Sequence, residues 1–285
     1  NQNINNVHRV DSVIIFSPGE NYLHYDSATY IWIQGKMIIN SYQDTLWAGK
    51  VRVNGDVLFG NENYWDIPNM FNKIDSLWVG GNASINQNST ILCDSIFGDA
   101  VFNGSYSLGS NLWQTSQKNN FGHLVVMGNS TFTGINQAEH CVLHGNATFS
   151  NFNSFDSLYL APGKMYSISG ADSLKVASDL LIRGNNCFPI QLRSTTQEQQ
   201  ATLWKPDGEV SGDFLELRDI NAAGGATFFA GSYSTDLGNN TGWQFNNSPG
   251  YVYGLGPDTS LCIGQTLSTI NFNGAYSYLW QDGST

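Results

Sequence analysis

The stretch Val51-Arg52-Val53-Asn54-Gly55-Asp56-Val57-Leu58-Phe59 decides the fold, because its pattern returns along the chain about every 20 residues. Apolar residues alternate with polar ones on both sides of the Gly-Asp pair, which is the period of a β-strand with one buried face. Residues 77–85 repeat the pattern, and residues 31–39 repeat it with Lys36 after the glycine. Shorter copies follow at Gly98-Asp99, Gly128-Asn129, Gly145-Asn146 and Gly184-Asn185.

A repeat of this length predicts a coil that stacks on itself. Pro18-Gly19 and Pro162-Gly163 add two variant corners, and the corners together give about 21 residues per turn, within the range of solenoid repeats. That is short for a propeller blade, and the Leu-rich signature of a horseshoe repeat is missing. We therefore predict an all-β fold with a right-handed parallel β-helix. The alternative, one or two antiparallel sandwiches, would need hairpin turns at irregular spacing.

The corner also predicts how the interior is packed. Two residues after each glycine the side chain is mostly small, and four residues after it the side chain is Phe or Ile. A small residue followed by a large one suits the narrow interior of a coil. Gly followed by Asn or Asp suggests a bend with positive φ, which Gly accepts freely and Asn tolerates. We read the Asn-x-Ser/Thr matches at Asn82, Asn129 and Asn146 as the same turn chemistry.

Composition narrows the function classes. The chain has 285 residues, a formal charge of −11 and only 12 Lys and Arg without a basic stripe, so we expect no nucleic-acid partner. No apolar run is long enough to span a bilayer, so we expect no membrane insertion. Cys93 and Cys141 fall near equivalent corner positions two coils apart, about 10 Å, which is too far for a disulfide. We expect both to be free and buried.

A second pattern begins near the end of the chain. Residues 246–250 are rich in turn formers, and the following segment reads as strand, turn, strand and a Trp-containing strand. This order resembles the opening of an immunoglobulin-like sandwich, but 30 residues cannot complete one. We assign residues 1–246 to the β-helix, 247–255 to a linker and 256–285 to the start of a truncated immunoglobulin-like or PKD-like domain.

Two stretches carry a resemblance to a known class of protein. Residues 256–267 and the segment Tyr278-Leu279-Trp280-x-Asp282-Gly283-Ser284 resemble PKD/immunoglobulin-like modules of large secreted Bacteroidota surface proteins. The coil resembles the same proteins through Asp156-Ser157-Leu158, Pro162-Gly163-Lys164, residues 219–227 and Asn240-Thr241-Gly242-Trp243. The resemblance implies export through the outer membrane by type IX secretion machinery, an extracellular or cell-surface location, and roles in adhesion and gliding. We expect the chain to be a segment of a longer exported polypeptide.

The triplet Asp-Ser/Thr-apolar recurs along the coil. The simplest explanation is that Asp and Ser form the turn before each strand. The triplet also resembles the O-glycosylation sequon of Bacteroidota, which makes seven hydroxyls candidate glycan sites: Ser12, Ser27, Thr45, Ser76, Ser95, Ser157 and Ser173.

Few residues carry catalytic or metal-binding signals. Enzymes on β-helices use carboxylates on one face of a sheet, and the best candidates are Asp213, Glu216 and Asp219. We predict a solvated face with one ion pair there. Asp56 and Asp99 are candidate calcium ligands, although most equivalent corners carry Asn. The five histidines form no metal pair at helical spacing, and we predict no catalytic residue, metal site or cofactor.

Aromatic residues in the insertions between coils are a different signal. They could stack on sugar rings, contact a neighbouring chain or fold back over the edge of the coil. The candidates are Tyr64, Trp65, Phe71 and Trp113. We therefore expect a non-catalytic, extracellular structural or adhesive segment of a secreted bacterial surface protein. The alternative is a β-helix protein that binds or degrades polysaccharide, and this alternative in its enzymatic form requires a groove lined by carboxylates.

Overall fold

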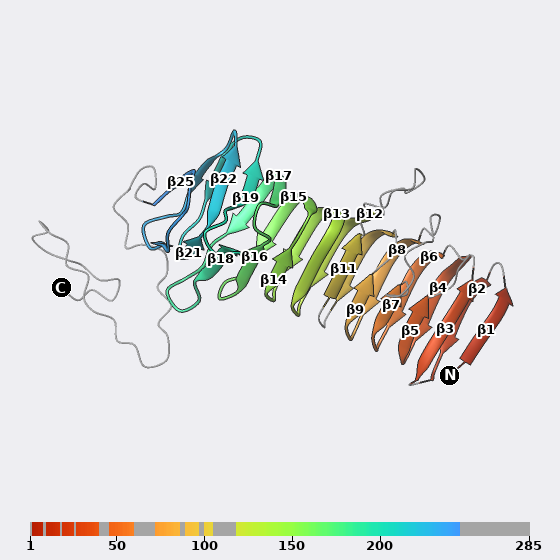
Figure 1. Cartoon of the computed structure of the whole chain (residues 1–285). Coiled ribbons are helices and arrows are strands. Elements are labelled where there is room, and N and C mark those ends of the chain that lie inside the picture. Colours follow the sequence, from red (N-terminus) through yellow and green to blue (C-terminus); the bar gives the residue numbers. More distant parts are fainter. Residues whose placement is uncertain are drawn as a thin grey trace, which may run out of the picture.

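The computed structural model describes residues 2–7, 10–17, 19–25, 27–39, 46–59, 72–85, 89–96, 100–104 and 118–245. These residues form strands and connecting turns, with no helix among them. The strands stack side by side in a long row that follows the chain from its N-terminal end (Figure 1). The fold is a parallel β-solenoid, as the repeated corner predicts.

Two long parallel sheets make up most of the solenoid. In sheet A the strands stack in the order β1 (Gln2–Val7), β3 (Glu20–Tyr25), β5 (Lys36–Ile39), β7 (Val57–Phe59), β9 (Ala83–Ile85), β11 (Ala100–Gly104), the first part of β13 (Ser130–Leu143), β14 (Ala147–Phe149), β16 (Met165–Ile168), β18 (Ile190–Ser194), β21 (Leu215–Arg218) and β24 (Thr235–Asp236). Each strand therefore pairs with the equivalent strand of the next coil.

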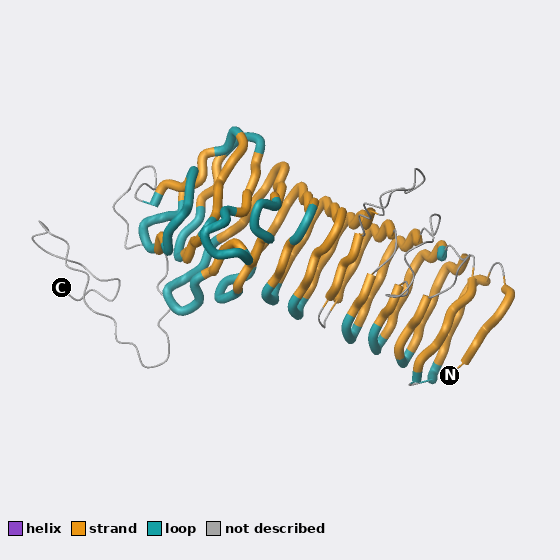
Figure 2. Tube along the Cα trace, viewed as in Figure 1, coloured by secondary structure: helices purple, strands orange, loops and turns teal. Residues whose placement is uncertain are grey.

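Sheet B lies on the other side of the corners, and in it too each strand pairs with the equivalent strand of the next coil. Its order is β2 (Val10–Ile15), β4 (Ser27–Ile33), β6 (Trp47–Val53), β8 (Asn72–Val79), β10 (Ser89–Ile96), β12 (Lys118–Val126), the second part of β13, β15 (Phe152–Leu160), β17 (Ser173–Ile182), β19 (Ala201–Lys205) and β22 (Ile220–Gly224). A short third sheet in the C-terminal coils contains β20 (Glu209–Ser211), β23 (Thr227–Phe229) and β25 (Trp243–Gln244). Figure 2 shows the loops gathered along the edges of the stack.

The interior alternates small and large side chains as predicted. Ala83, Ala100 and Ala147 occupy the small position, and all three are buried. The large position continues from coil to coil in register, through Ile39, Phe59, Ile85, Phe102, Phe132, Phe149 and Ile168. The rings of Phe102 and Phe132 stack at 4.7 Å between centroids, and those of Phe132 and Phe149 at 5.1 Å. The repeated +4 position thus builds a continuous aromatic and aliphatic column.

The expected reason for glycine at the corners is wrong for most of them. Of the described corners only the Pro-Gly corner at Gly163 has positive φ, 71°, and the other corner glycines do not. Glycine is needed because stacked corners approach closely. A Cβ on Gly55 would lie 2.7 Å from the carbonyl oxygen of Gly35, and one on Gly145 would collide with the carbonyl oxygen of Gly128. Backbone proximity between coils, rather than backbone conformation, excludes a side chain there.

The Asn or Asp after the corner glycine bonds to the next coil. Asp56 accepts a hydrogen bond from the backbone N–H of Asn82 at 2.8 Å, and Asn129 accepts one from the N–H of Asn146 at 3.1 Å. Asn146 in turn accepts one from the N–H of Met165 at 2.9 Å. These side chains therefore use the corner to join successive coils, and the interpretation of Asn129 and Asn146 as turn residues is consistent with this role.

A buried asparagine ladder was not predicted. Asn119, Asn136 and Asn153 are in register on three successive coils and are buried. Asn119 Nδ2 donates to Asn136 Oδ1, and Asn136 Nδ2 donates to Asn153 Oδ1, both at 3.0 Å. Asn136 and Asn153 also donate to the backbone carbonyls of Thr133 and Ser150. The sequence signal is the spacing of 17 residues, equal to that between the corners at Gly128 and Gly145.

Several sequence predictions lie outside the described residues. The linker at 247–255 and the immunoglobulin-like segment at 256–285 are among them. Cys141 is buried and its thiol is not part of a disulfide, as predicted, whereas the side chain of Cys93 is not described. Cys187 is disulfide-bonded, which the sequence analysis did not anticipate. The described part of the chain contains no helix with the length and apolarity that a membrane crossing requires.

Candidate functional site on the outer face of sheet B

The outer face of sheet B is shaped by a bend within most of its strands, from β2 to β15. In β8, Ile74 and Leu77 point inward, while Asp75 and Ser76 between them both face outward. β15 repeats this arrangement at Asp156-Ser157. Two consecutive outward residues require a bend, and the cross-coil register skips a position at this point. The Asp-Ser triplet in these coils therefore marks a bend inside a strand, not a turn before it.

One outward position forms a row that runs along the solenoid, and we call it the tryptophan row. The row passes in register from coil to coil through Ile14, Trp32, Arg52, Trp78, Val125, Val142, Tyr159 and Leu181. Ser95, whose side chain is not described, occupies the backbone position between Trp78 and Val125. Most of them are apolar or aromatic although they face away from the core. Ile14 is 53% exposed and Leu181 is 56% exposed. An aligned apolar row on the outside of a protein is the kind of surface that contacts another molecule.

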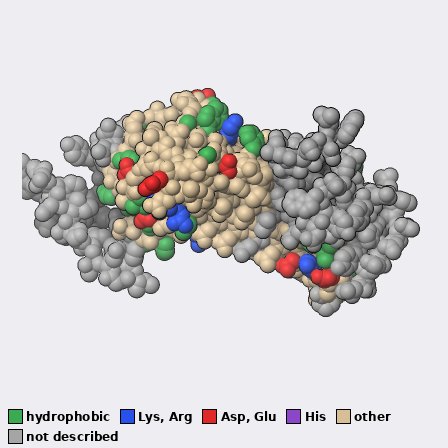
Figure 3. Space-filling view, in the orientation of Figure 1, with side chains coloured by type: hydrophobic (Ala, Val, Ile, Leu, Met, Phe, Trp, Pro, Cys, Tyr) green, Lys and Arg blue, Asp and Glu red, His purple; other side chains and the backbone are tan. Residues whose placement is uncertain are grey.

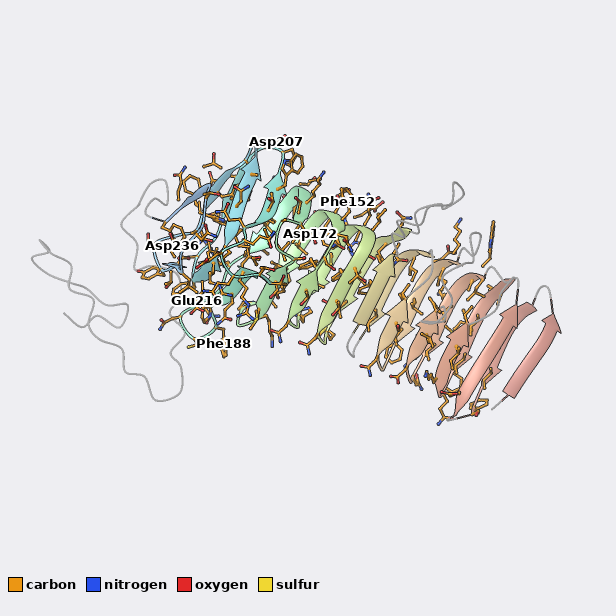
Figure 4. The ribbon with its side chains drawn as sticks, in the orientation of Figure 1. Phe152, Asp172, Phe188, Asp207, Glu216 and Asp236 are labelled. Atoms are coloured by element: carbon orange, nitrogen blue, oxygen red, sulfur yellow. The ribbon has the colours of Figure 1, made fainter. Side chains whose placement is uncertain are left out.

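Basic side chains lie over aromatic rings on this face. Arg52 Cζ is 4.5 Å from the ring centroid of Trp78 on the next coil, and Phe16 contacts the ring of Trp32 edge-on at 5.0 Å. Lys175 lies 5.0 Å from the ring of Phe152 and 5.5 Å from that of Trp204. Phe152 is visible at the upper edge of the solenoid in Figure 4. The chain has only 12 Lys and Arg, and two of them, Arg52 and Lys175, lie over aromatic rings on this face.

The neighbouring outward position forms a second row, the serine–histidine row. The row passes in register through Ser12, Tyr30, Lys50, Ser76, His123, His140, Ser157 and Asp179. Cys93, whose side chain is not described, occupies the backbone position between Ser76 and His123. Three candidate glycan sites, Ser12, Ser76 and Ser157, lie in this row, Ser12 exposed and the other two half-buried. Ser173 is half-buried at the start of β17. Ser27 and Ser95 lie in β4 and β10, where their side chains are not described, and Thr45 lies outside the described residues.

The same row contains two adjacent histidines that the sequence analysis did not pair. His123 on β12 and His140 on β13 are in register and exposed. Their ring centroids are 4.5 Å apart with a tilt of 33°. The sequence signal for this pair is again a separation of 17 residues, which is the length of one coil here, and not a helical spacing.

The structure does not bring the candidate carboxylates together in a groove. Glu216 and Arg218 lie half-buried on the same face of β21, and Glu216 accepts a hydrogen bond from Gln191 Nε2 at 2.9 Å. The expected solvated face is wrong for Asp219. Asp219 is buried, 3.4 Å from the guanidinium of Arg218, and accepts a bond from Asn239 at 2.7 Å. Asp213 accepts bonds from backbone N–H groups of Phe214 and Tyr233. Figure 4 places Glu216 at the opposite edge from Phe152.

The remaining candidates add little to this face. Asp56 bonds to the next corner as described above, and Asp99 lies outside the described residues. The candidate aromatic contacts Tyr64, Trp65, Phe71 and Trp113 also lie outside the described residues. Within the described part of the chain no three His, Cys, Asp or Glu side chains gather as a metal cluster. On the described part of the face drawn in Figure 3, the charged side chains are few and scattered.

Comparison with known proteins gives no match. No protein family matches the chain, and neither does any curated protein or any solved structure.

Proposed function

We propose that this chain is a non-catalytic, extracellular structural and adhesive segment of a large secreted bacterial surface protein. The observation that carries the proposal is the tryptophan row, which repeats an outward apolar or aromatic position on successive coils of sheet B. A solenoid supported by hydrogen bonds between every coil is a stiff carrier for such a row. A row of weak contacts at a fixed spacing suits multivalent attachment.

The sequence resemblance supplies the biological setting of this proposal. Secreted Bacteroidota surface proteins with β-helix and PKD-like modules leave the cell by type IX secretion and serve in adhesion and gliding. We propose the same location, the same export partner during secretion, and O-glycans on the Asp-Ser/Thr triplets. No cofactor is required for a role of this kind.

A polysaccharide is the partner that best fits the tryptophan row. Aromatic rings offer apolar surface to the C–H faces of sugars, and Arg52 between Trp32 and Trp78 offers a cation to acidic groups. The two tryptophans lie two strands apart, about 9.6 Å along the stack. Such a spacing is comparable with the length of a disaccharide unit, so an extended chain could lie along the row.

The test is binding and turnover across a panel of acidic and neutral polysaccharides immobilised on beads. We expect retention of the wild-type chain without release of oligosaccharides, and at least a tenfold loss of retention in Trp32→Ala/Trp78→Ala. Leu237→Ala, an exposed apolar residue distant in sequence from the row, is the matched control and should bind as the wild type. Depolymerisation of any polysaccharide, or equal retention of the double variant, would overturn the proposal.

A further inference from the structure

The serine–histidine row contains an arrangement that neither the adhesive proposal nor the stability of the coil requires. His123 and His140 are neighbours on adjacent parallel strands, both exposed, with ring centroids 4.5 Å apart. Imidazole nitrogen is a common ligand of divalent transition metals. We propose that His123 and His140 form a two-histidine site for a divalent transition-metal ion, which links strands β12 and β13.

The ring geometry suits a shared ion. Metal–nitrogen bonds of about 2.0–2.1 Å at angles of 90–109° place two coordinating nitrogens roughly 3.0–3.4 Å apart. The two ring centroids are 4.5 Å apart with a tilt of 33°, so coordination of one ion requires rotations about the side-chain torsions that bring one nitrogen of each ring to this separation. Because both side chains are exposed, those rotations displace solvent and not packed neighbours.

The surroundings favour a cation. The outward residues that precede His140 and Ser157 in their bends are Glu139 and Asp156, both exposed carboxylates. The corresponding residue before His123 is Gly122, which leaves room beside that ring. Carboxylates near a metal-bound imidazole strengthen and orient it. Since the described residues provide no third ligand of this kind at the pair, water completes the coordination. The ion is therefore expected to bind with micromolar rather than nanomolar affinity.

The ion is assigned to the two histidines alone, and Cys93 is the neighbour that tests this assignment, because a thiolate is itself a transition-metal ligand. Cys93 precedes His123 in register, and Ser157 follows His140. Nickel is the most informative probe, because imidazole suits it well and a hydroxyl does not. Bound metal would stabilise the pair of coils by mass action, since the unfolded chain does not hold the two rings together.

The experiment is calorimetric titration of the untagged full chain with Ni²⁺. We expect one site per chain, at least tenfold weaker binding in His123→Ala and in His140→Ala, and unchanged binding in His144→Ala. His144 is the matched control because it lies four residues from His140 and contacts Tyr159. Cys93→Ser should also keep the site.

A spectroscopic measurement makes the result independent of folding changes. Pulsed paramagnetic resonance of bound Cu²⁺ should detect two imidazole nitrogens in the wild type and one in each single variant. Equal Ni²⁺ binding by the His123→Ala/His140→Ala chain would overturn the proposal, and so would loss of binding in His144→Ala or Cys93→Ser. Polysaccharide retention is measured separately, so failure of the metal site leaves the adhesive proposal standing.

Discussion

At the scale of single residues, Tyr166 shows how one side chain can break the interior pattern and still fit. It occupies the position that is small in most coils, pairing in register with Ala147, and it is fully buried. Its hydroxyl lies 3.1 Å from the carbonyl oxygen of Leu143 and 3.2 Å from that of Ala161. Burial away from water raises the pKa of Tyr166 well above its usual value, because the phenolate would lose its hydration.

This raised pKa predicts sensitivity to alkali. The folded chain holds the phenolic proton more tightly than the unfolded chain, so this contribution to stability is complete below the unfolded pKa of about 10 and is lost as pH rises above it. We expect the free energy of unfolding to fall above about pH 10. Tyr166→Phe should flatten that fall while costing about 1 kcal/mol at neutral pH. Urea unfolding at several pH values measures both effects, and an unchanged alkaline slope in the variant would contradict the assignment.

At the scale of the strand, the asparagine ladder predicts unequal costs for similar substitutions. Asn136 makes two ladder bonds, to Asn119 and Asn153, whereas Asn119 makes one and its Oδ1 has no partner. Removing Asn136 leaves buried polar groups unpaired on both sides, each at a cost of about 1–3 kcal/mol. We expect Asn136→Ala to destabilise the chain by about 3 kcal/mol or more and Asn119→Ala by clearly less.

A combined variant distinguishes the cost of leaving buried polar groups without hydrogen bonds from the cost of changing the packing. Replacing all three ladder asparagines by leucine removes both side chains of each ladder hydrogen bond at once, so no ladder amide stays buried without its partner. The carbonyl oxygens of Thr133 and Ser150 lose their side-chain donors. Leu174 already occupies the next position in register after Asn153. We therefore expect the triple leucine variant to be more stable than Asn136→Ala in thermal unfolding. Equal or greater damage in the triple variant would mean that shape, not hydrogen bonding, governs these positions.

The strands also show why some features were predictable and others were not. Alternating apolar residues around Gly55 are a local signal with a period of two, so the strands and the inward column follow from sequence alone. The asparagine ladder, the His123–His140 pair and the tryptophan row depend on which residues meet between coils. That register is set by insertions of different length, which the sequence shows only as irregular spacing. The role of glycine at Gly55 was misjudged for the same reason, since its constraint comes from the neighbouring coil.

At the scale of the whole molecule, the buried side chains of the described coils form one continuous column along the solenoid. Each coil pairs with the one before it and the one after it, and the aromatic column continues through them without closing on itself. In such an architecture the free energy of unfolding is approximately the sum of the intrinsic stability of each repeat and the interface energies between neighbouring repeats. For the proposed adhesive role this means that the tryptophan row keeps its spacing wherever neighbouring coils stay paired, even if a remote coil unfolds.

If stability comes from contacts between neighbouring coils, the described coils within residues 118–245 should fold on their own. A fragment of residues 118–245 keeps the coils from β12 to β25 and should show a β-rich circular dichroism spectrum with cooperative thermal unfolding. A fragment of residues 130–245 lacks β12 and its ladder bond from Asn119, so we expect a Tm about 5–10 °C lower, which corresponds to a few kcal/mol in a domain of this size. Two unfolded fragments would show instead that the solenoid needs all its coils at once, and the repeat-by-repeat account would then fail.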